Sequence, residues 1–337
     1  MTREPVRRAG EVEPVATAQQ PLDSGFGARS EPAEVLAGIE LDGVTAIVTG
    51  GYSGLGLETT RALVDAGASV IAPARRPDHA RDVFAEAGLD DVEVASLDLG
   101  DQDSVVAFAD GVVEAGTNVA LLINNAAIMA CPETRVGPGW EAQFATNHLG
   151  HYSLANRLWP ALAAGDGARV VSLSSTGHKL SPIRFDDPQF TSGYDKWVAY
   201  GQAKTANSLF AVHLDALGRE HGVRAFAVHP GGIMTELQRH LPQEEMRAMG
   251  WIDDDGKVHE GFKTPTQGAS TSLWAATSPQ LDGHGGVYCE DCDIAAEVDP
   301  DSPMARFAGV NPHAVDPDDA ARLWELSAEL TGVDAFA

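Results

Sequence analysis

The sequence predicts an α/β protein with one doubly wound parallel sheet of about seven strands and helices on both of its faces. Three observations predict this class. From residue 44 onward, short apolar or β-branched runs alternate with longer stretches of helical periodicity. A glycine-rich loop directly follows the first of these runs. No repeat or linker divides the alternation, so we expect a single domain.

Each predicted strand is a short run rich in apolar and β-branched residues. These runs occupy residues 44–49, 68–74, 91–97, 119–124, 168–174 and 223–229, and GVYCE at 286–290 is the seventh. Helical stretches lie at 55–66, 103–114, 140–162 and 196–220, with a short helix near 34–39 and a last one at 318–330. This order suits a parallel sheet, because parallel neighbours need crossover connections.

The regions outside the alternation set the expected domain boundaries. Residues 1–20 mix Pro, Glu, Arg and Gln without periodicity, which predicts a flexible N-terminal segment. Residues 21–300 form the predicted main domain, and residues 236–266 interrupt it as an insertion after the sixth strand. Insertions at strand ends are where a substrate pocket is expected. Residues 301–337 form a predicted C-terminal tail with a final helix.

The composition indicates a globular protein and excludes several kinds of partner. Hydrophobic residues make up 44% and charged residues 21%, and the net charge of -26 repels phosphate, so neither nucleic acid nor an anionic membrane is an expected partner. No run of about 18 apolar residues and no signal-peptide core occurs. Three cysteines are too few and too odd for a disulfide framework, so we expect a cytoplasmic location.

A phosphate-binding loop is predicted after the first strand. It reads TGGYSGLG at residues 49–56 and leads at once into a helical stretch. Glycines let the backbone approach a pyrophosphate closely, and the N–H groups and dipole of a helix N-terminus attract its charge. An isolated loop of this kind could be a simple turn. Its place between a strand and a helix indicates a Rossmann-type dinucleotide site.

The end of the second strand carries the signal for cofactor choice. A carboxylate there would bind the ribose 2′-hydroxyl, whereas an arginine would accept a 2′-phosphate. The chain reads APARR at 72–76, and Arg75 can form forked, charge-assisted bonds to phosphate. We therefore expect NADP, with NAD less favoured. The alternative, that Arg75 and Arg76 are solvated loop residues, stays open because Asp78 and Asp82 lie nearby.

Tyr200 and Lys204 form a candidate catalytic pair. They lie four residues apart in the predicted helix 196–220, so they share one face. A free phenol has a pKa of about 10, too high for a base near neutrality, and a neighbouring ammonium group lowers that pKa. The pair therefore suits proton transfer to or from an oxygen atom.

The spacing TGxxxGxG together with YGQAK resembles the short-chain dehydrogenase/reductase family, over roughly residues 41–241. The resemblance implies an NAD(P)-dependent oxidoreductase that interconverts a carbonyl and an alcohol, with Tyr200 as general acid/base. Ser175 would hydrogen-bond the substrate oxygen, with Ser174 as the alternative. Lys204 would hold the nicotinamide ribose, and Asn147 would support a proton relay to it.

The resemblance also implies cofactor contacts along the carboxyl edge of the sheet. Asp98-Leu99 is similar to an adenine-contacting pair, and NNAA at 124–127 departs from the family's NNAG in its last position. PGxxxT, ending at Thr235, would hold the nicotinamide carboxamide. For Asn124, capping of a strand end is the alternative. The predicted contacts are Thr49, Gly50, Ser53, Gly54, Leu55, Gly56, Arg75, Asp98, Leu99, Asn124, Ala126, Tyr200, Lys204, Pro230, Gly231 and Thr235.

Within the family, the wide gap between Ser175 and Tyr200, with YGQAKTANSLFA and VHPGGIMTEL, resembles the retinol dehydrogenase, WW-domain oxidoreductase and protochlorophyllide reductase branch. This implies a small apolar carbonyl or alcohol substrate, and we expect reduction to be favoured. Apolar residues of the insertion could line its pocket or pack on the core. They are Met234, Leu237, Met246, Met249, Trp251 and Phe262.

Two other functions stay open. One is a catalytically idle NADP-binding sensor or scaffold, which the joint presence of Ser175, Tyr200, Lys204 and Asn147 disfavours. The other is epimerisation or dehydration of a nucleotide sugar, whose enzymes usually carry a different glycine spacing. No metal is expected, because CEDC at 289–292 lacks a second ligand pair. Family members commonly pair through two long helices, which leaves a homo-oligomer open.

Overall fold

The computed structural model describes residues 17–165, 167–299, 301–302 and 308–337, so most of the predicted flexible segment 1–20 lies outside the described residues. A seven-stranded sheet has the order β2-β1-β3-β6-β7-β8-β9, and every neighbouring pair is parallel except β8 with β9. Its strands are β1 Thr45–Val48, β2 Ser69–Ile71, β3 Leu121–Asn124, β6 Ala168–Leu173, β7 Val223–His229, β8 Val287–Glu290 and β9 Asp293–Ile294. The predicted fold class is confirmed.

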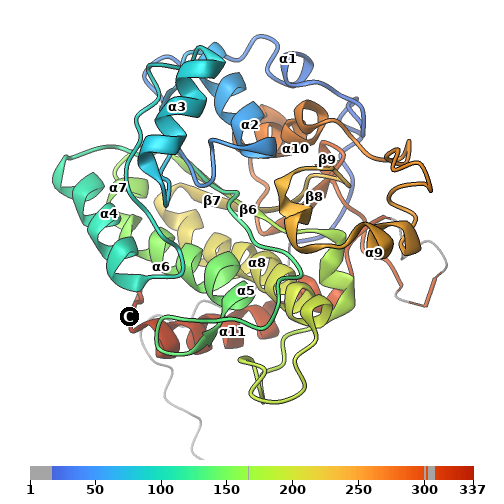
Figure 1. The fold of residues 1–337 in the computed structure, drawn as a ribbon. Coiled ribbons are helices and arrows are strands. Elements are labelled where there is room, and N and C mark those ends of the chain that lie inside the picture. The colour runs from blue at the N-terminus through green and yellow to red at the C-terminus, as the bar shows by residue number, and fades with distance from the viewer. Residues whose placement is uncertain (1–16, 166, 300, 303–307) are drawn as a thin grey trace, which may run out of the picture.

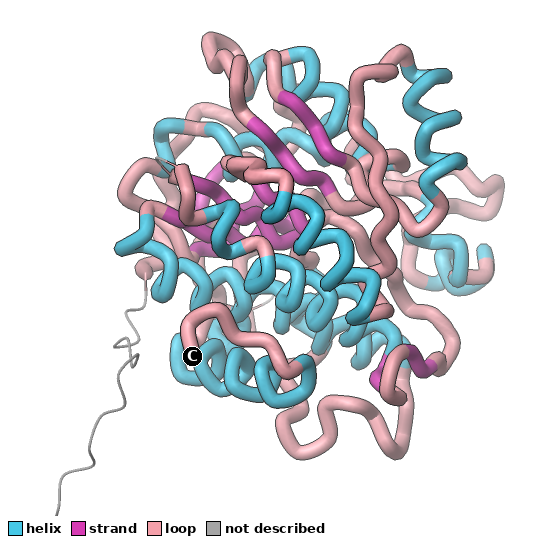
Figure 2. The backbone as a smooth tube through the Cα atoms, turned by 90° about the vertical axis from the view of Figure 1, so that its left-hand side faces the viewer, coloured by secondary structure: helices cyan, strands magenta, loops and turns pink. Residues whose placement is uncertain are grey.

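Helices cover both faces of this sheet, as Figures 1 and 2 show. One face carries α2 Gly54–Asp65, α3 Pro77–Ala87 and α10 Pro265–Thr277, with α1 Pro32–Val35 beside α10. The other carries α4 Gln102–Glu114, α6 Gly150–Arg157, α7 Trp159–Leu162 and α8 Lys196–Gly218. Successive strand residues point to opposite faces, so Ala46 and Val48 join one core and Ile47 the other.

The predicted final helix, α11 Pro317–Thr331, forms an additional layer against α8 (Figure 1). Its Trp324 stacks on Phe210 of α8, with ring centroids 6.0 Å apart and planes 8° from parallel. Ser327 lies 2.7 Å from Nε2 of His148, a buried hydrogen bond. The C-terminal tail is therefore packed on the main domain through apolar and polar contacts.

The predicted third strand at 91–97 is wrong as a strand. The segment runs beside β2 but makes only two isolated parallel bridges, Ile71 with Glu93 and Ala74 with Ser96. Pro73 has no N–H to extend the pairing toward β1, so β2 ends at Ile71. Beyond that point the N–H groups of Ala72 and Ala74 still donate to the carbonyls of Glu93 and Ala95, so the segment runs beside the chain after β2 without forming a regular strand.

The predicted helix 140–162 is broken into several pieces. Trp140–Glu141 is β5, which pairs with β4 Arg135–Val136 in a small hairpin. The chain continues as α5 Ala142–Phe144, the π-helical turn η1 Ala145–Leu149, α6 and α7. A π-helical turn interrupts the regular α-helical pattern, and Pro160 lacks the N–H that would join α7 to α6. Periodicity alone does not report either break.

The remaining helical elements are short and lie near the carboxyl edge or in connections. They are η2 Thr176–Leu180, η3 Arg219–His221, η4 Glu236–His240, α9 Gln243–Ala248, η5 Pro279–Leu281 and η6 Pro312–Ala314. Of these, η4 and α9 belong to the insertion 236–266, and η2 directly follows β6. These three elements border the site described next.

Candidate functional site

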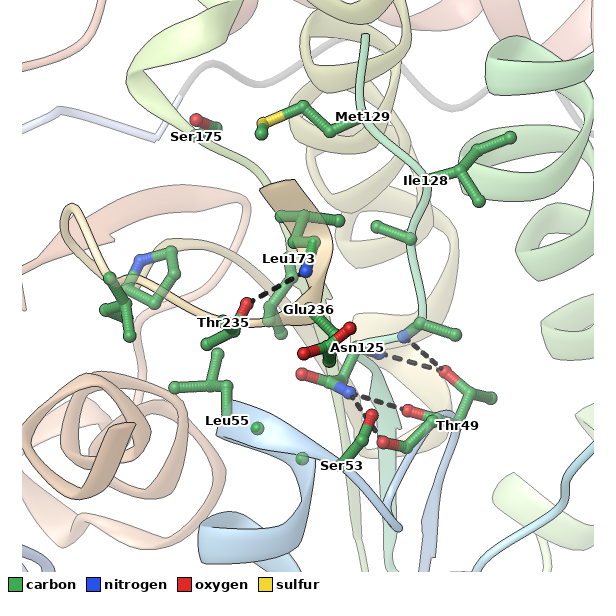
Figure 3. A pocket seen from close by; sticks show the side chains of 18 of the residues that line it. Thr49, Ser53, Leu55, Asn125, Ile128, Met129, Leu173, Ser175, Thr235 and Glu236 are labelled. Carbon is green, nitrogen blue, oxygen red and sulfur yellow. Dashed lines mark hydrogen bonds between the residues drawn. The ribbon is translucent and has the colours of Figure 1, made fainter. Parts of the chain in front are cut away.

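A cleft of ≈ 730 Å³ lies at the carboxyl ends of the strands, where a doubly wound sheet binds its ligands. Figure 3 shows Thr49 and Ser53 at one end and Ser175 and Met129 at the other. The cleft is lined by most of the predicted site residues, namely Thr49, Gly50, Ser53, Gly54, Leu55, Gly56, Arg75, Leu99, Ala126, Ser175, Tyr200, Lys204, Pro230, Gly231 and Thr235. Asp98, Asn124 and Asn147 are not among the lining residues.

The glycine-rich loop is fixed against the end of β3 by Asn125, a residue that the sequence analysis did not select. Its Nδ2 donates to the carbonyl of Thr49 at 2.8 Å, and its backbone N–H donates to Thr49 Oγ1 at 2.9 Å. A Cβ at Gly56 would lie 2.6 Å from Asn125 Nδ2, so no larger residue fits there. The second Asn of NNAA was the available signal for this role.

The N-terminus of α2 faces the cleft with donors suited to a pyrophosphate. Ser53 is its N-cap residue, and its side chain makes no capping hydrogen bond. The first N–H groups of a helix lack partners within that helix, so they can bind anionic oxygens. The glycine contacts and this donor set therefore fit a dinucleotide cofactor.

Arg75 and Arg76 are exposed at the edge of the same cleft. Asp78, one of the two acidic residues that could have paired with these arginines, instead forms an ion pair with Arg81 at 2.7 Å. The two guanidinium groups give this end of the cleft a positive charge in a chain of net charge -26.

The three predicted residues outside the lining have other surroundings. Asp98 Oδ1 accepts the N–H of Gly100 at 2.9 Å. Asn124 is 1% exposed, and neither of its side-chain polar atoms has a hydrogen-bond partner among the described residues, which gives no sign of capping. Asn147 binds both backbone groups of Ile128, accepting its N–H and donating to its carbonyl, each at 2.9 Å. It thereby fixes the segment after β3 that borders the cleft.

Tyr200 and Lys204 lie on one face of α8, whose first turn is capped by Asp195. Both side chains are buried, and Lys204 Nζ donates to the carbonyl of Leu173 at 2.8 Å. That Nζ lies 5.7 Å from the centroid of the Tyr200 ring. The sequence pattern therefore places the two groups next to each other.

The expected lowering of the Tyr200 pKa is not found in the chain alone. Burial raises the pKa of Tyr200 to about 12, and a hydrogen bond with Ser175 only partly opposes that shift. Burial also lowers the pKa of Lys204 to about 7. Removal from water disfavours the charged form of each group and is the largest cause of both shifts. Tyr200 is therefore protonated at neutral pH.

The two candidate serines have different surroundings. Ser174 Oγ donates to the carbonyl of Lys204 at 2.8 Å and accepts from Ser208 at 2.9 Å, so it is occupied within the core. Ser175 Oγ accepts the N–H of Gly177 at 3.0 Å, and its hydroxyl hydrogen-bonds Tyr200. Of the two serines, Ser175 is therefore the one that contacts Tyr200.

His151 links the cofactor loop to the π-helical turn. Its Nδ1 donates to the carbonyl of Asn147 at 2.9 Å, and its Nε2 lies 2.9 Å from Thr49 Oγ1. Burial lowers the pKa of His151 to about 4, so the ring is neutral and Nε2 accepts from the hydroxyl. No periodic pattern in the sequence predicts this connection.

The end of the cleft near Tyr200 has an apolar and aromatic wall. Leu237, Trp251 and Phe262 from the predicted set line it, together with Met129. The other members of that set, Met234, Met246 and Met249, are not lining residues, although Met246 packs against the cluster that contains Tyr200. Trp197, which is not itself a lining residue, meets Tyr200 and Trp251 edge-on, with ring centroids 6.2 and 6.0 Å apart.

Comparison with known proteins places the chain among dehydrogenases. The family model of the short chain dehydrogenases matches residues 44–246. A "Probable oxidoreductase" of Streptomyces lividans is 44% identical over 86% of this chain and 98% of its own length. Retinol dehydrogenase 11 of Mus musculus is 35% identical over 88% of each chain. Among the described residues, no helix has the length and apolar character needed to cross a bilayer.

Solved structures agree with this relationship. An uncharacterized protein from Mycobacterium paratuberculosis superposes with a TM-score of 0.67 at 33% identity, covering 88% of this chain and 96% of its own. A Beutenbergia cavernae structure, described as an NAD(P) dependent gluconate 5-dehydrogenase with bound NADP, gives 0.60 at 25% identity over 74% of this chain and 96% of its own.

Proposed function

Because the chain belongs to the short-chain dehydrogenase/reductase family, in its retinol dehydrogenase-like branch, we propose that it is an NADPH-dependent reductase of small apolar aldehydes or ketones. One observation carries the proposal. Ser175 lies at the end of the cleft away from the glycine-rich loop (Figure 3), and Tyr200 and Lys204, which line the same cleft, lie next to it. A cofactor bound along that cleft would reach from the phosphate-binding loop to the reacting groups.

When bound, the nicotinamide cofactor supplies hydride to the carbonyl carbon. The protein supplies the proton and the orientation. Ser175 donates a hydrogen bond to the carbonyl oxygen, and the Tyr200 hydroxyl gives that oxygen its proton as negative charge develops there. A protonated Tyr200 is suited to this direction, since its pKa in the chain alone is about 12. Lys204 would hold the nicotinamide ribose, and Asn147 fixes the backbone of Ile128 beside the cleft.

NADP is the proposed cofactor because of the two arginines at the phosphate end. Arg75 and Arg76 both line the cleft after β2, where a 2′-phosphate would lie. A dianionic phosphate gains charge-assisted, forked hydrogen bonds from a guanidinium group, and a ribose hydroxyl gains much less. The NADP named in the Beutenbergia cavernae structure supports this choice.

The proposed substrate is apolar because its end of the cleft is built from hydrophobic and aromatic side chains. Met129, Leu237, Trp251 and Phe262 surround the approach to Tyr200. Such a wall stabilises an apolar chain by removing it from water, while Ser175 and Tyr200 provide hydrogen bonds for a single oxygen. The retinol named for the Mus musculus relative is an apolar alcohol of this kind.

The test is NADPH oxidation with decanal and retinal as probes, run beside NADH and the Tyr200→Phe variant. We expect turnover that prefers NADPH and that falls by at least about 100-fold in Tyr200→Phe, within the range attributed to a general acid. Tyr200→Phe should still bind NADPH, measured by fluorescence. Tight NADPH binding by the wild type without turnover of any carbonyl would overturn the proposal in favour of a binding protein.

A further inference from the structure

A C-terminal segment outside the residues matched by the family model returns to the turn that carries Ser175. We call residues 308–313 the clamp. Three hydrogen bonds connect it to η2. Lys179 Nζ donates to the carbonyl of Ala308 at 2.8 Å, the Asn311 N–H donates to His178 Nε2 at 3.1 Å, and His313 Nε2 donates to the carbonyl of His178 at 3.0 Å. Two of these bonds converge on His178.

His178 connects the clamp to Ser175. Its side chain is buried, and its Nδ1 lies 2.7 Å from the carbonyl oxygen of Ser175. Because a backbone N–H can only donate, Nε2 must accept from Asn311, and the neutral ring then carries its proton on Nδ1. That proton is donated to Ser175. The clamp and the Ser175 carbonyl therefore require the same tautomer, and the ring joins the two.

The turn between Ser175 and His178 leaves little room for adjustment. The carbonyl of Ser175 also accepts the backbone N–H of His178 at 3.0 Å. Gly177 donates to Ser175 Oγ and packs so closely on Tyr200 that a Cβ there would lie 2.7 Å from its ring. A rotation of this turn would move the Ser175 hydroxyl relative to Tyr200.

We propose that the clamp positions Ser175 through His178, so that a segment 133 residues away in the sequence sets the geometry of the carbonyl-binding hydroxyl. The proposal rests on the function proposed above. His178 and Asn311 act here as positioning residues, because neither lines the cleft.

The backbone N–H of Asn311, which donates to His178, can be removed by a substitution that keeps the backbone conformation. Its φ of -78° and ψ of 143° suit proline, which has no N–H. Its side chain makes no capping bond, and its Oδ1 has no partner within the described residues. Asn311→Ala keeps the N–H and is therefore the matched control for Asn311→Pro.

We expect Asn311→Pro to lower kcat for decanal by about tenfold or more relative to Asn311→Ala, since small misplacements of a catalytic group are costly. The dissociation constant for NADPH should stay equal in the two variants. In a Ser175→Ala background, the same exchange should have no further effect on kcat, because the group being positioned is gone. A merely structural role would lower activity in both backgrounds.

The outcomes separate the two proposals. If Ser175→Ala turns over as well as wild type, the proposed role of Ser175 fails. If Ser175→Ala loses activity but Asn311→Pro and Asn311→Ala have equal kcat, the clamp proposal alone is overturned. Should Asn311→Pro not fold, His178→Asn decides the question. The Asn amide can still donate to Ser175 but is too short to accept from Asn311, so His178→Asn should lower kcat by about tenfold in the wild-type background and have no effect in the Ser175→Ala background. A wild-type kcat for His178→Asn would refute the clamp.

Discussion

We predict that Glu245 holds the insertion 236–266 against the helix that carries Tyr200. It lies on α9, and its two carboxylate oxygens bind the start of α8, one at 2.6 Å from Lys196 Nζ and the other at 2.7 Å from Trp197 Nε1. Trp197 in turn packs edge-on against Tyr200. Glu245→Ala removes both bonds at once and should free α9 from the helix that carries Tyr200.

The free energy lost in Glu245→Ala can be estimated from the solvent exposure of Glu245 and Lys196. The Glu245 and Lys196 side chains are 24% and 30% exposed, so solvent screening limits their ion pair to about 0.2–1 kcal/mol. The hydrogen bond from Trp197 to the Glu245 carboxylate adds about 1.5 kcal/mol, the low end of the range for hydrogen bonds to charged groups, because the carboxylate is partly exposed. The sum is about 2 kcal/mol. If substrate binds only the closed loop, KM should rise by up to about 30-fold.

The assay measures KM and kcat for decanal at saturating NADPH. We expect Glu245→Ala to raise KM strongly and to change kcat little, while Glu245→Gln keeps the Trp197 bond and shows a smaller rise. Glu244→Ala, on an exposed neighbour in the same helix, is the control. A KM for Glu245→Ala equal to that of Glu244→Ala would refute the reasoning.

The pH dependence of this contact has a definite sign. Hydrogen bonds from Lys196 and Trp197 hold the pKa of Glu245 below its usual value. A lowered pKa means that the contact is fully present above the unfolded value of about 4.3 and is lost as the pH falls through the lower folded value. We therefore expect this contact to leave KM independent of pH between about pH 5 and 8, and KM to rise only in more acidic solution.

Three further predictions concern the cofactor, the buried lysine and the outer helix. Arg75→Ala should weaken NADPH binding by about tenfold or more and leave NADH binding unchanged, as fluorescence titration can show. Burial lowers the pKa of Lys204 to about 7, so between that pH and about 10.4 the unfolded chain binds more protons than the native one. Without cofactor, the free energy of unfolding in urea should rise between about pH 7 and 8.5, below the range in which the buried thiols of Cys131, Cys289 and Cys292, whose pKa values are raised, oppose the rise, and Lys204→Met should remove it. Trp324→Ala should lower the free energy of unfolding by about 3–5 kcal/mol, since its ring is 5% exposed between α8 and α11.

The sequence could predict the reacting groups because each is specified by a local pattern. A glycine spacing between a strand and a helix predicts residues 49–56, and a four-residue spacing on one helix brings Tyr200 beside Lys204. The cleft contains both groups. The predicted lowering of the Tyr200 pKa is not found in the chain alone, because the degree of burial is a property of the whole fold.

The supporting residues could not be found in the same way, because their partners are distant in the sequence. Asn311 and His178 are 133 positions apart, and Glu245 and Trp197 are 48 apart. A single histidine, asparagine or glutamate carries no spacing signal until the fold brings its partner within hydrogen-bond distance. His151 shows the same limit at closer range, because the helix predicted over 140–162 is interrupted by the π-helical turn beside it.

This division has a consequence for engineering the site. In the proposed mechanism, Ser175 and Tyr200 act on the oxygen that gains the proton, so the effects of substitutions there should fall on kcat. Glu245 acts on the closed state of a loop, so its effect should fall on KM, whereas the clamp acts on the placement of a hydroxyl and should again lower kcat. Kinetics can therefore distinguish the Glu245 contact from the clamp, because one should change KM and the other kcat. Both act through hydrogen bonds to residues of α8 or η2.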